Sequence, residues 1–82
     1  MSERPATRAD LRAAAWLTLR VFADDRGAVH HSLAALALLD ADERDDATGA
    51  RYVAERLKSA VVVTDAEGRL VGLRRREPEP VA

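Results

Sequence analysis

The stretch that decides the fold runs from Val61 to Glu77 and reads VVVTDAEGRLVGLRRRE. Two apolar runs flank the segment Asp65-Ala66-Glu67-Gly68, which suits a type I turn in which Gly68 supplies a positive φ. Such a turn pairs Asp65 with Arg69. Strict alternation beyond the turn places four apolar side chains on one face, and we expect this face to point toward the core. The four are Val61, Val63, Val71 and Leu73. The stretch therefore predicts a β-hairpin with arginines along its exit.

The segment before the hairpin begins with signals for a long helix. Thr7-Arg8-Ala9-Asp10 fits a capping box, and helical periodicity continues to about Ala23. The apolar stripe consists of Leu11, Ala15, Leu19 and Phe22. Gly27 suits the left-handed conformation that often follows a helix, so we expect the first helix to stop before it.

Two further helices are predicted between this point and the hairpin. Residues 28–30 read as a short extended piece, and Ser32 is a plausible N-cap for a second helix from Leu33 to about Leu39. The third helix takes up ATGARYVAERLKSA, residues 47–60, capped by Asp45 or Asp46, with Gly49 in its first turn.

These elements make one small α+β domain of three helices followed by a two-stranded hairpin. The chain has 82 residues, which is enough for a single thin core. We expect residues 1–6 to form a flexible arm, residues 7–76 the domain, and residues 77–82, rich in proline and glutamate, a disordered tail.

Composition limits the classes of function. The chain has 13 basic and 14 acidic residues, a net charge of −1 and no cysteine, which excludes disulfides and thiolate metal sites. No apolar run is long enough to span a bilayer, and the N-terminal residues lack the apolar core of a signal peptide. We therefore expect a cytoplasmic protein that does not associate with membranes.

Residues suited to catalysis or metal binding are not gathered in any known spacing. His30 and His31 are adjacent, and on an extended piece their side chains would point to opposite sides. The glycines are scattered, so they form no phosphate-binding loop. We expect no enzyme activity, no cofactor and no metal.

The order of elements resembles the winged helix-turn-helix family. SLAALALL corresponds to the positioning helix, TGARYVAERLKSA to the recognition helix and VVVTDAEGRLVGLRRR to the wing. The resemblance implies a transcriptional regulator that binds duplex DNA, with recognition-helix residues in the major groove and wing arginines on phosphates. The positions it implies for DNA contact are Thr48, Arg51, Tyr52, Glu55, Arg56, Arg69, Arg74 and Arg76.

Two features favour other functions. The acidic run Asp40–Asp46 would form a link of about seven residues between the second and third helices, and its charge would repel a DNA backbone. A protein-interaction module, which uses the first helix or the hairpin edge without binding DNA, is the alternative. The hairpin with its preceding helix also looks like part of a CBS domain, which senses adenosine nucleotides.

The first helix is apolar on more than one side, which predicts a homodimer. No charge occurs from Ala13 to Leu19, and a helix of this kind favours burial on several faces. A second copy of so small a domain could supply that cover. We expect the dimer interface to contain Leu11, Trp16 and Leu17.

Overall fold

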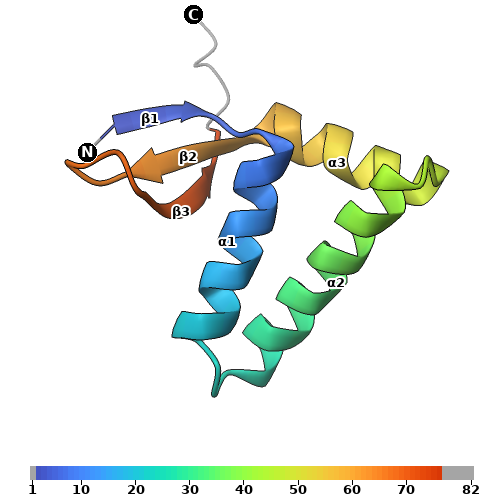
Figure 1. Ribbon diagram of the computed structural model, residues 1–82, viewed down its shortest axis with the longest axis horizontal. Helices are drawn as coiled ribbons and strands as arrows, with labels where there is room; N and C mark the ends of the chain where they lie inside the picture. The colour runs from blue at the N-terminus through green and yellow to red at the C-terminus, as the bar shows by residue number, and fades with distance from the viewer. Residues whose placement is uncertain (1, 77–82) are drawn as a thin grey trace, which may run out of the picture.

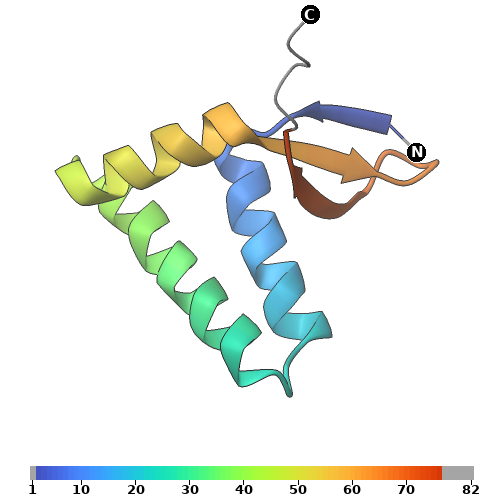
Figure 2. The ribbon, with the colours of Figure 1, turned by 180° about the vertical axis from the view of Figure 1, so that it is seen from behind.

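Three helices stand beside a three-stranded antiparallel sheet in the computed structural model, which describes residues 2–76 (Figure 1). The α+β class and the C-terminal hairpin are thus confirmed. Helix α1 lies between α2 and the sheet, and α3 crosses above both helices (Figures 1 and 2). The predicted tail, residues 77–82, lies outside the described residues. No helix within residues 2–76 has the length and apolar character needed to cross a membrane.

Helix α1 (Arg8–Val21) begins at the capping box that the sequence predicts. The Thr7 hydroxyl accepts a hydrogen bond from the Asp10 amide at 3.3 Å, and the Asp10 carboxylate accepts one from the Thr7 amide at 2.9 Å. These bonds satisfy amides that the first helical turn leaves without a partner. The helix buries Leu11 and Ala15, while Phe22, which follows its last turn, is exposed.

Helix α2 (Arg26–Glu43) is much longer than the second helix that was predicted. The extended piece expected at residues 28–30 is helical, and Ser32 is a buried residue within the helix. The N-cap is Asp25, whose Oδ1 accepts a hydrogen bond from the Ala28 amide at 3.0 Å. Gly27 therefore lies in the first turn of α2 and does not have a positive φ.

Helix α3 (Ala47–Ser59) agrees with the prediction and is capped by Asp46. The link from α2 is only residues 44–46, because α2 continues through most of the acidic run, and Asp45 adopts a φ of 59°. Gly49 allows the two helices to approach closely: a Cβ there would lie 2.4 Å from the Asp42 amide nitrogen. The seven-residue link predicted from the sequence is wrong, and the observed turn is tight.

The sheet consists of β1 (Ser2–Pro5), β2 (Ala60–Thr64) and β3 (Leu70–Arg75), with β2 in the centre. Strand β1 stands where a flexible arm was expected, and it pairs with the β2 edge that a two-stranded hairpin would leave open. The Arg4 guanidinium also donates two hydrogen bonds to the Asp10 carboxylate, at 2.6 and 2.8 Å. These contacts explain why a segment without apolar alternation is ordered.

The hairpin has the predicted turn but a different register beyond it. Gly68 has a φ of 80°, and the Asp65 amide donates to the Arg69 carbonyl at 2.9 Å. A β-bulge then leaves Val71 unpaired, so that Val63 pairs with Gly72 and Val62 with Leu73. Because of this shift, Leu73 shares its face of the sheet with Val62, whereas strict alternation would place it with Val61 and Val63.

The core-facing valine is therefore Val62, with none of its surface exposed. Val61 is buried too, at 8% exposed, but it lies on the opposite face of β2 and outside the core cluster, and Val63 is only half-buried, so the predicted inward face is wrong. Val71 is exposed. Leu73 is the one predicted member that packs against the core cluster. The cluster contains residues of the three helices and of the sheet. Its fully buried members are Val53, Ala60 and Val62.

Candidate nucleic-acid interface and adjoining groove

The exposed face of α3 carries only part of the predicted contact set. Thr48 and Arg51 are exposed, together with Lys58, and Glu55 is an acidic side chain on the same surface. Tyr52 and Arg56 are half-buried and line a groove on another side of the helix. This division follows from the position of Gly49 and Val53, which turn one face of α3 toward α2 and the core.

The hairpin arginines differ in their partners. Arg69 bonds to Asp65 through Nε at 3.0 Å and to Glu67 through Nη2 at 3.3 Å. The Arg69 amide and guanidinium both donate to Asp65 and lower the pKa of that carboxyl. Arg74 of β3 forms an ion pair with Glu3 of β1. This ion pair spans β2 on the face that carries Val61 and Val63. Arg69 is thus engaged within the hairpin turn and Arg74 across the sheet.

The end of β3 adjoins the last turn of α3. The Arg76 amide donates a hydrogen bond to the Ser59 carbonyl, and Arg75 pairs with Ala60. Both arginine side chains are exposed, and so is Lys58. The sequence did not identify Arg75 and Lys58 as site residues. The helical spacing from Arg51 could have indicated Lys58, but the place of Arg75 depends on the bulge.

We use the name basic end of α3 for four of these basic side chains: Lys58, Arg75 and Arg76, which lie at or beside the last turn of the helix, and Arg51, which lies two turns earlier on the same exposed face. Within residues 2–76, none of the four has a salt bridge to a carboxylate. No carboxylate of the described residues therefore neutralises these four charges.

The acidic run is largely engaged with arginines of α1. Arg8 bonds to Asp42 at 2.8 Å, and Arg12 bonds to Asp40 at 2.9 Å and to Glu43 at 3.0 Å. The hydrogen bonds and charges of these carboxylates raise the pKa of both arginines. Carboxylates in the last turn of a helix oppose its dipole, and the arginines offset that cost.

The predicted dimer residues have three different environments. Leu11 is only 5% exposed and belongs to the core of this chain, so it cannot form an interface with a second copy. Leu17 is half-buried. Trp16 is 57% exposed, and the other large apolar side chains that are exposed within residues 2–76 are Val21, Phe22, Leu33 and Val71.

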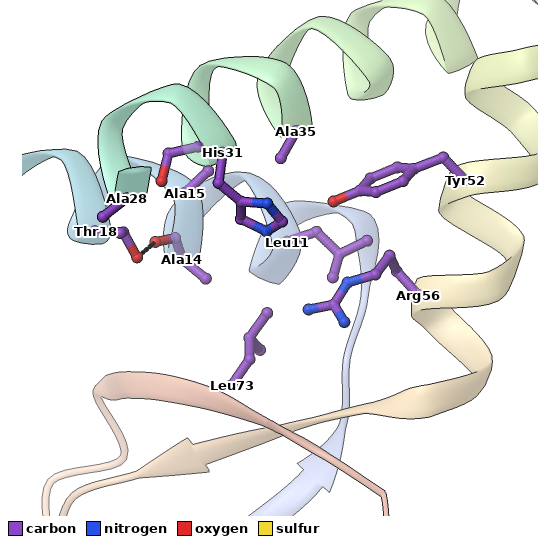
Figure 3. A pocket seen from close by; sticks show the side chains of 11 residues that line it. Leu11, Ala14, Ala15, Thr18, Ala28, His31, Ala35, Tyr52, Arg56 and Leu73 are labelled. Atoms are coloured by element: carbon purple, nitrogen blue, oxygen red, sulfur yellow. Dashed lines mark hydrogen bonds between the residues drawn. The ribbon is translucent and has the colours of Figure 1, made fainter. Parts of the chain in front are cut away.

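A groove of about 350 Å³ lies between the three helices and β3 (Figure 3). Its walls are mostly small or apolar side chains: Leu11, Ala14, Ala15, Ala28, Ala35 and Leu73. The polar side chains of the lining are those of Thr18, His31, Ser32, Tyr52 and Arg56. The Thr18 hydroxyl donates to the Ala14 carbonyl at 3.0 Å, so it is already engaged within α1.

His31, Tyr52 and Arg56 converge on one part of the groove. His31 comes from α2 and the other two from α3, and Figure 3 shows the Tyr52 hydroxyl directed toward the imidazole. The Arg56 guanidinium extends between Tyr52 and Leu73 and has no salt bridge within the described part of the chain. In residues 2–76 no three His, Asp or Glu side chains are grouped as metal ligands would be.

The geometry thus offers two sites with distinct chemistry. One is an open basic surface at the basic end of α3, and the other is a concave groove that holds the Arg56 guanidinium, which has no carboxylate partner within residues 2–76. No protein-family model matches the chain, and neither a curated protein nor a solved structure does.

Proposed function

We propose that this protein binds duplex DNA, with α3 in the major groove and the adjoining end of β3 on the phosphate backbone. The observation that carries this proposal is the basic end of α3, where four exposed cations lack carboxylate partners among residues 2–76. Cations of this kind can neutralise phosphates and release counterions, which is the main source of affinity for DNA.

The connection between α2 and α3 supports the same proposal. The turn at residues 44–46 is short and the two helices approach closely at Gly49, as a helix-turn-helix unit requires. The acidic run, which we expected to repel DNA, is a weaker obstacle, because Asp40, Asp42 and Glu43 are paired with arginines of α1.

The proposed contacts differ in part from those that the family resemblance implies. Thr48, Arg51 and Arg76 remain in the set, and Lys58 and Arg75 join it. Arg69 is held by carboxylates of the hairpin turn and Arg74 by Glu3 of β1, so we assign them a smaller share of the affinity. Tyr52 and Arg56 are assigned to the groove instead.

Duplex binding should be measured by fluorescence anisotropy at salt concentrations from about 50 to about 200 mM, a range over which phosphate contacts lose much of their affinity. We expect the slope of log K against log salt to fall by about 0.9 for each phosphate contact removed. The double variant R51Q/K58Q should therefore bind more weakly and with a slope smaller in magnitude by about one to two.

The matched control is R20Q/R26Q, which removes the same charge from exposed residues at the opposite end of the helices. This control should keep most of the affinity of the parent protein. Equal losses in both double variants would show that only net charge matters, and no binding at about 50 mM salt would refute the proposal.

We also propose that the protein forms a homodimer through the exposed side of α1, centred on Trp16. Trp16 is 57% exposed, and tryptophan is enriched among the side chains that anchor protein interfaces. If DNA affinity is absent, this surface and the exposed edges of β1 and β3 favour the protein-interaction alternative.

A further inference from the structure

We propose that the groove between the helices and β3 is a binding site for a small organic carboxylate with a compact apolar body. The proposal does not depend on DNA binding, since it concerns a different side of α3. It rests on the shape and apolar lining of the groove and on the Arg56 guanidinium at its polar side, which has no salt bridge within the described part of the chain.

The apolar part of the groove exists because its walls are built from alanines. Ala14 and Ala15 line it from α1, and Ala28 and Ala35 line it from α2. Methyl side chains leave a space of about 350 Å³ where larger residues would fill the interior. That volume is at the lower end of the range for small-molecule sites, so the apolar body of a ligand has to be small.

The polar part of the groove selects the charge of the ligand. Arg56 is half-buried, and no carboxylate of residues 2–76 pairs with it. A guanidinium presents parallel N–H donors that match the two oxygens of a carboxylate. The Tyr52 hydroxyl and the His31 ring lie beside it and offer further hydrogen-bonding groups (Figure 3).

A carboxylate fits this arrangement better than a phosphate monoester. Arg56 is the only arginine or lysine that lines the groove, so the site holds one fixed positive charge. A phosphate monoester carries close to two negative charges at neutral pH and has three acceptor oxygens, which one arginine neutralises only in part. A single carboxylate balances one guanidinium and uses its paired donors.

The test is an amide NMR titration of the whole chain with benzoate, benzamide and phenyl phosphate, without DNA. Benzamide is the neutral match for benzoate, and phenyl phosphate is the more highly charged one. We expect benzoate to shift the amides of groove residues such as Ala14, Ala35 and Tyr52. Its affinity should exceed that of benzamide by about tenfold or more, which corresponds to the loss of one charge-assisted contact.

The variant R56Q should lower benzoate affinity by about tenfold or more while leaving benzamide affinity unchanged. R51Q is its control, because it removes the same charge from the exposed face of the same helix. Y52F, which keeps the aromatic ring, should cause a smaller loss. Spectra of each free variant establish that it is folded before the titration begins.

Three outcomes would overturn the proposal. Equal affinities for benzoate and benzamide would remove the charge recognition, and tighter binding of phenyl phosphate would change the ligand class. Equal effects of R51Q and R56Q would place the binding outside the groove. None of these results bears on DNA affinity, and a failure to bind DNA would leave the titration unaffected.

Discussion

At the residue scale, Asp10 makes the stability of the fold sensitive to acid. The two hydrogen bonds from Arg4, with help from Thr7, lower the pKa of Asp10 from 3.8 to about 2. Because the pKa is lower in the folded chain, its contribution is complete above about pH 4 and disappears as the pH falls through about 2. The shift corresponds to at most about 2 kcal/mol of unfolding free energy.

The variant D10N should therefore be less stable than the parent by about 1 to 2 kcal/mol at neutral pH, measured by urea denaturation. The difference between the two proteins should shrink as the pH approaches about 2, where the parent carboxyl also takes up a proton. A difference that stays constant between about pH 7 and pH 2 would contradict the ion-pair explanation.

Replacement by alanine should affect the stability of the fold very differently at Gly49 and at Gly72. At Gly49 a Cβ would lie 2.4 Å from the Asp42 nitrogen and 2.6 Å from the Leu38 carbonyl oxygen, and backbone atoms cannot move aside without separating α2 from α3. At Gly72 a Cβ would meet nothing within 4 Å.

We expect G49A to lower the unfolding free energy by about 1 to 3 kcal/mol, in spite of the better helix propensity of alanine. G72A should change it by less than about 0.5 kcal/mol or raise it slightly. Thermal denaturation followed by circular dichroism compares the two variants directly. If G49A were as stable as the parent, the close contact between α2 and α3 would be wrong.

At the scale of elements, the register of the hairpin decides which valine supports the core. Val62 is fully buried beside Leu73, whereas Val71 is the extra residue of the bulge and is exposed. V62A should cost about 1 to 3 kcal/mol through lost burial and the cavity it leaves, and V71A less than about 0.5 kcal/mol. Without the bulge, V71A would be the costly substitution, so chemical denaturation of the pair tests the register.

Elements with local signals could be predicted from the sequence, and elements that depend on distant partners could not. The capping box at Thr7, the turn ending at Gly68 and the extent of α3 all follow from residues close together in the chain. The start of α2 was misplaced because Asp25 and Ser32 are both good N-caps, and only packing selects between them.

Strand β1 is the clearest example of an element whose structure depends on residues distant in the sequence. Its residues show no apolar alternation, and its order comes from pairing with β2 and from the bonds between Arg4 and Asp10. The bulge at Val71 is equally invisible to a rule of strict alternation. The candidate DNA contacts were affected in the same way, because the packing of Gly49 and Val53 decides that Arg51 is exposed and Arg56 lines the groove.

At the scale of the whole molecule, the carboxylates near the end of α2 are neutralised by arginines of α1. The end of α2 is paired with α1, while the basic end of α3 keeps exposed cations, although the net charge is −1. Net charge alone therefore describes this protein poorly, and the local field near α3 is the quantity that matters for an anionic partner.

The oligomeric state is the other property that belongs to the whole molecule, and Trp16 provides its test. Because Trp16 is 57% exposed and the core lies on the side of Leu11, W16D should leave the domain folded. We expect the parent protein to sediment as a dimer and W16D as a monomer with an unchanged circular dichroism spectrum. Burying a charge at an apolar interface is costly enough to separate the two copies.

The matched control is L33D, which places the same charge at an exposed leucine of α2. It should sediment as the parent does if α1 alone forms the interface. A parent protein that is monomeric at every concentration would refute the dimer. If L33D dissociates the dimer and W16D does not, the second copy docks on α2, and Trp16 then remains available to a different protein.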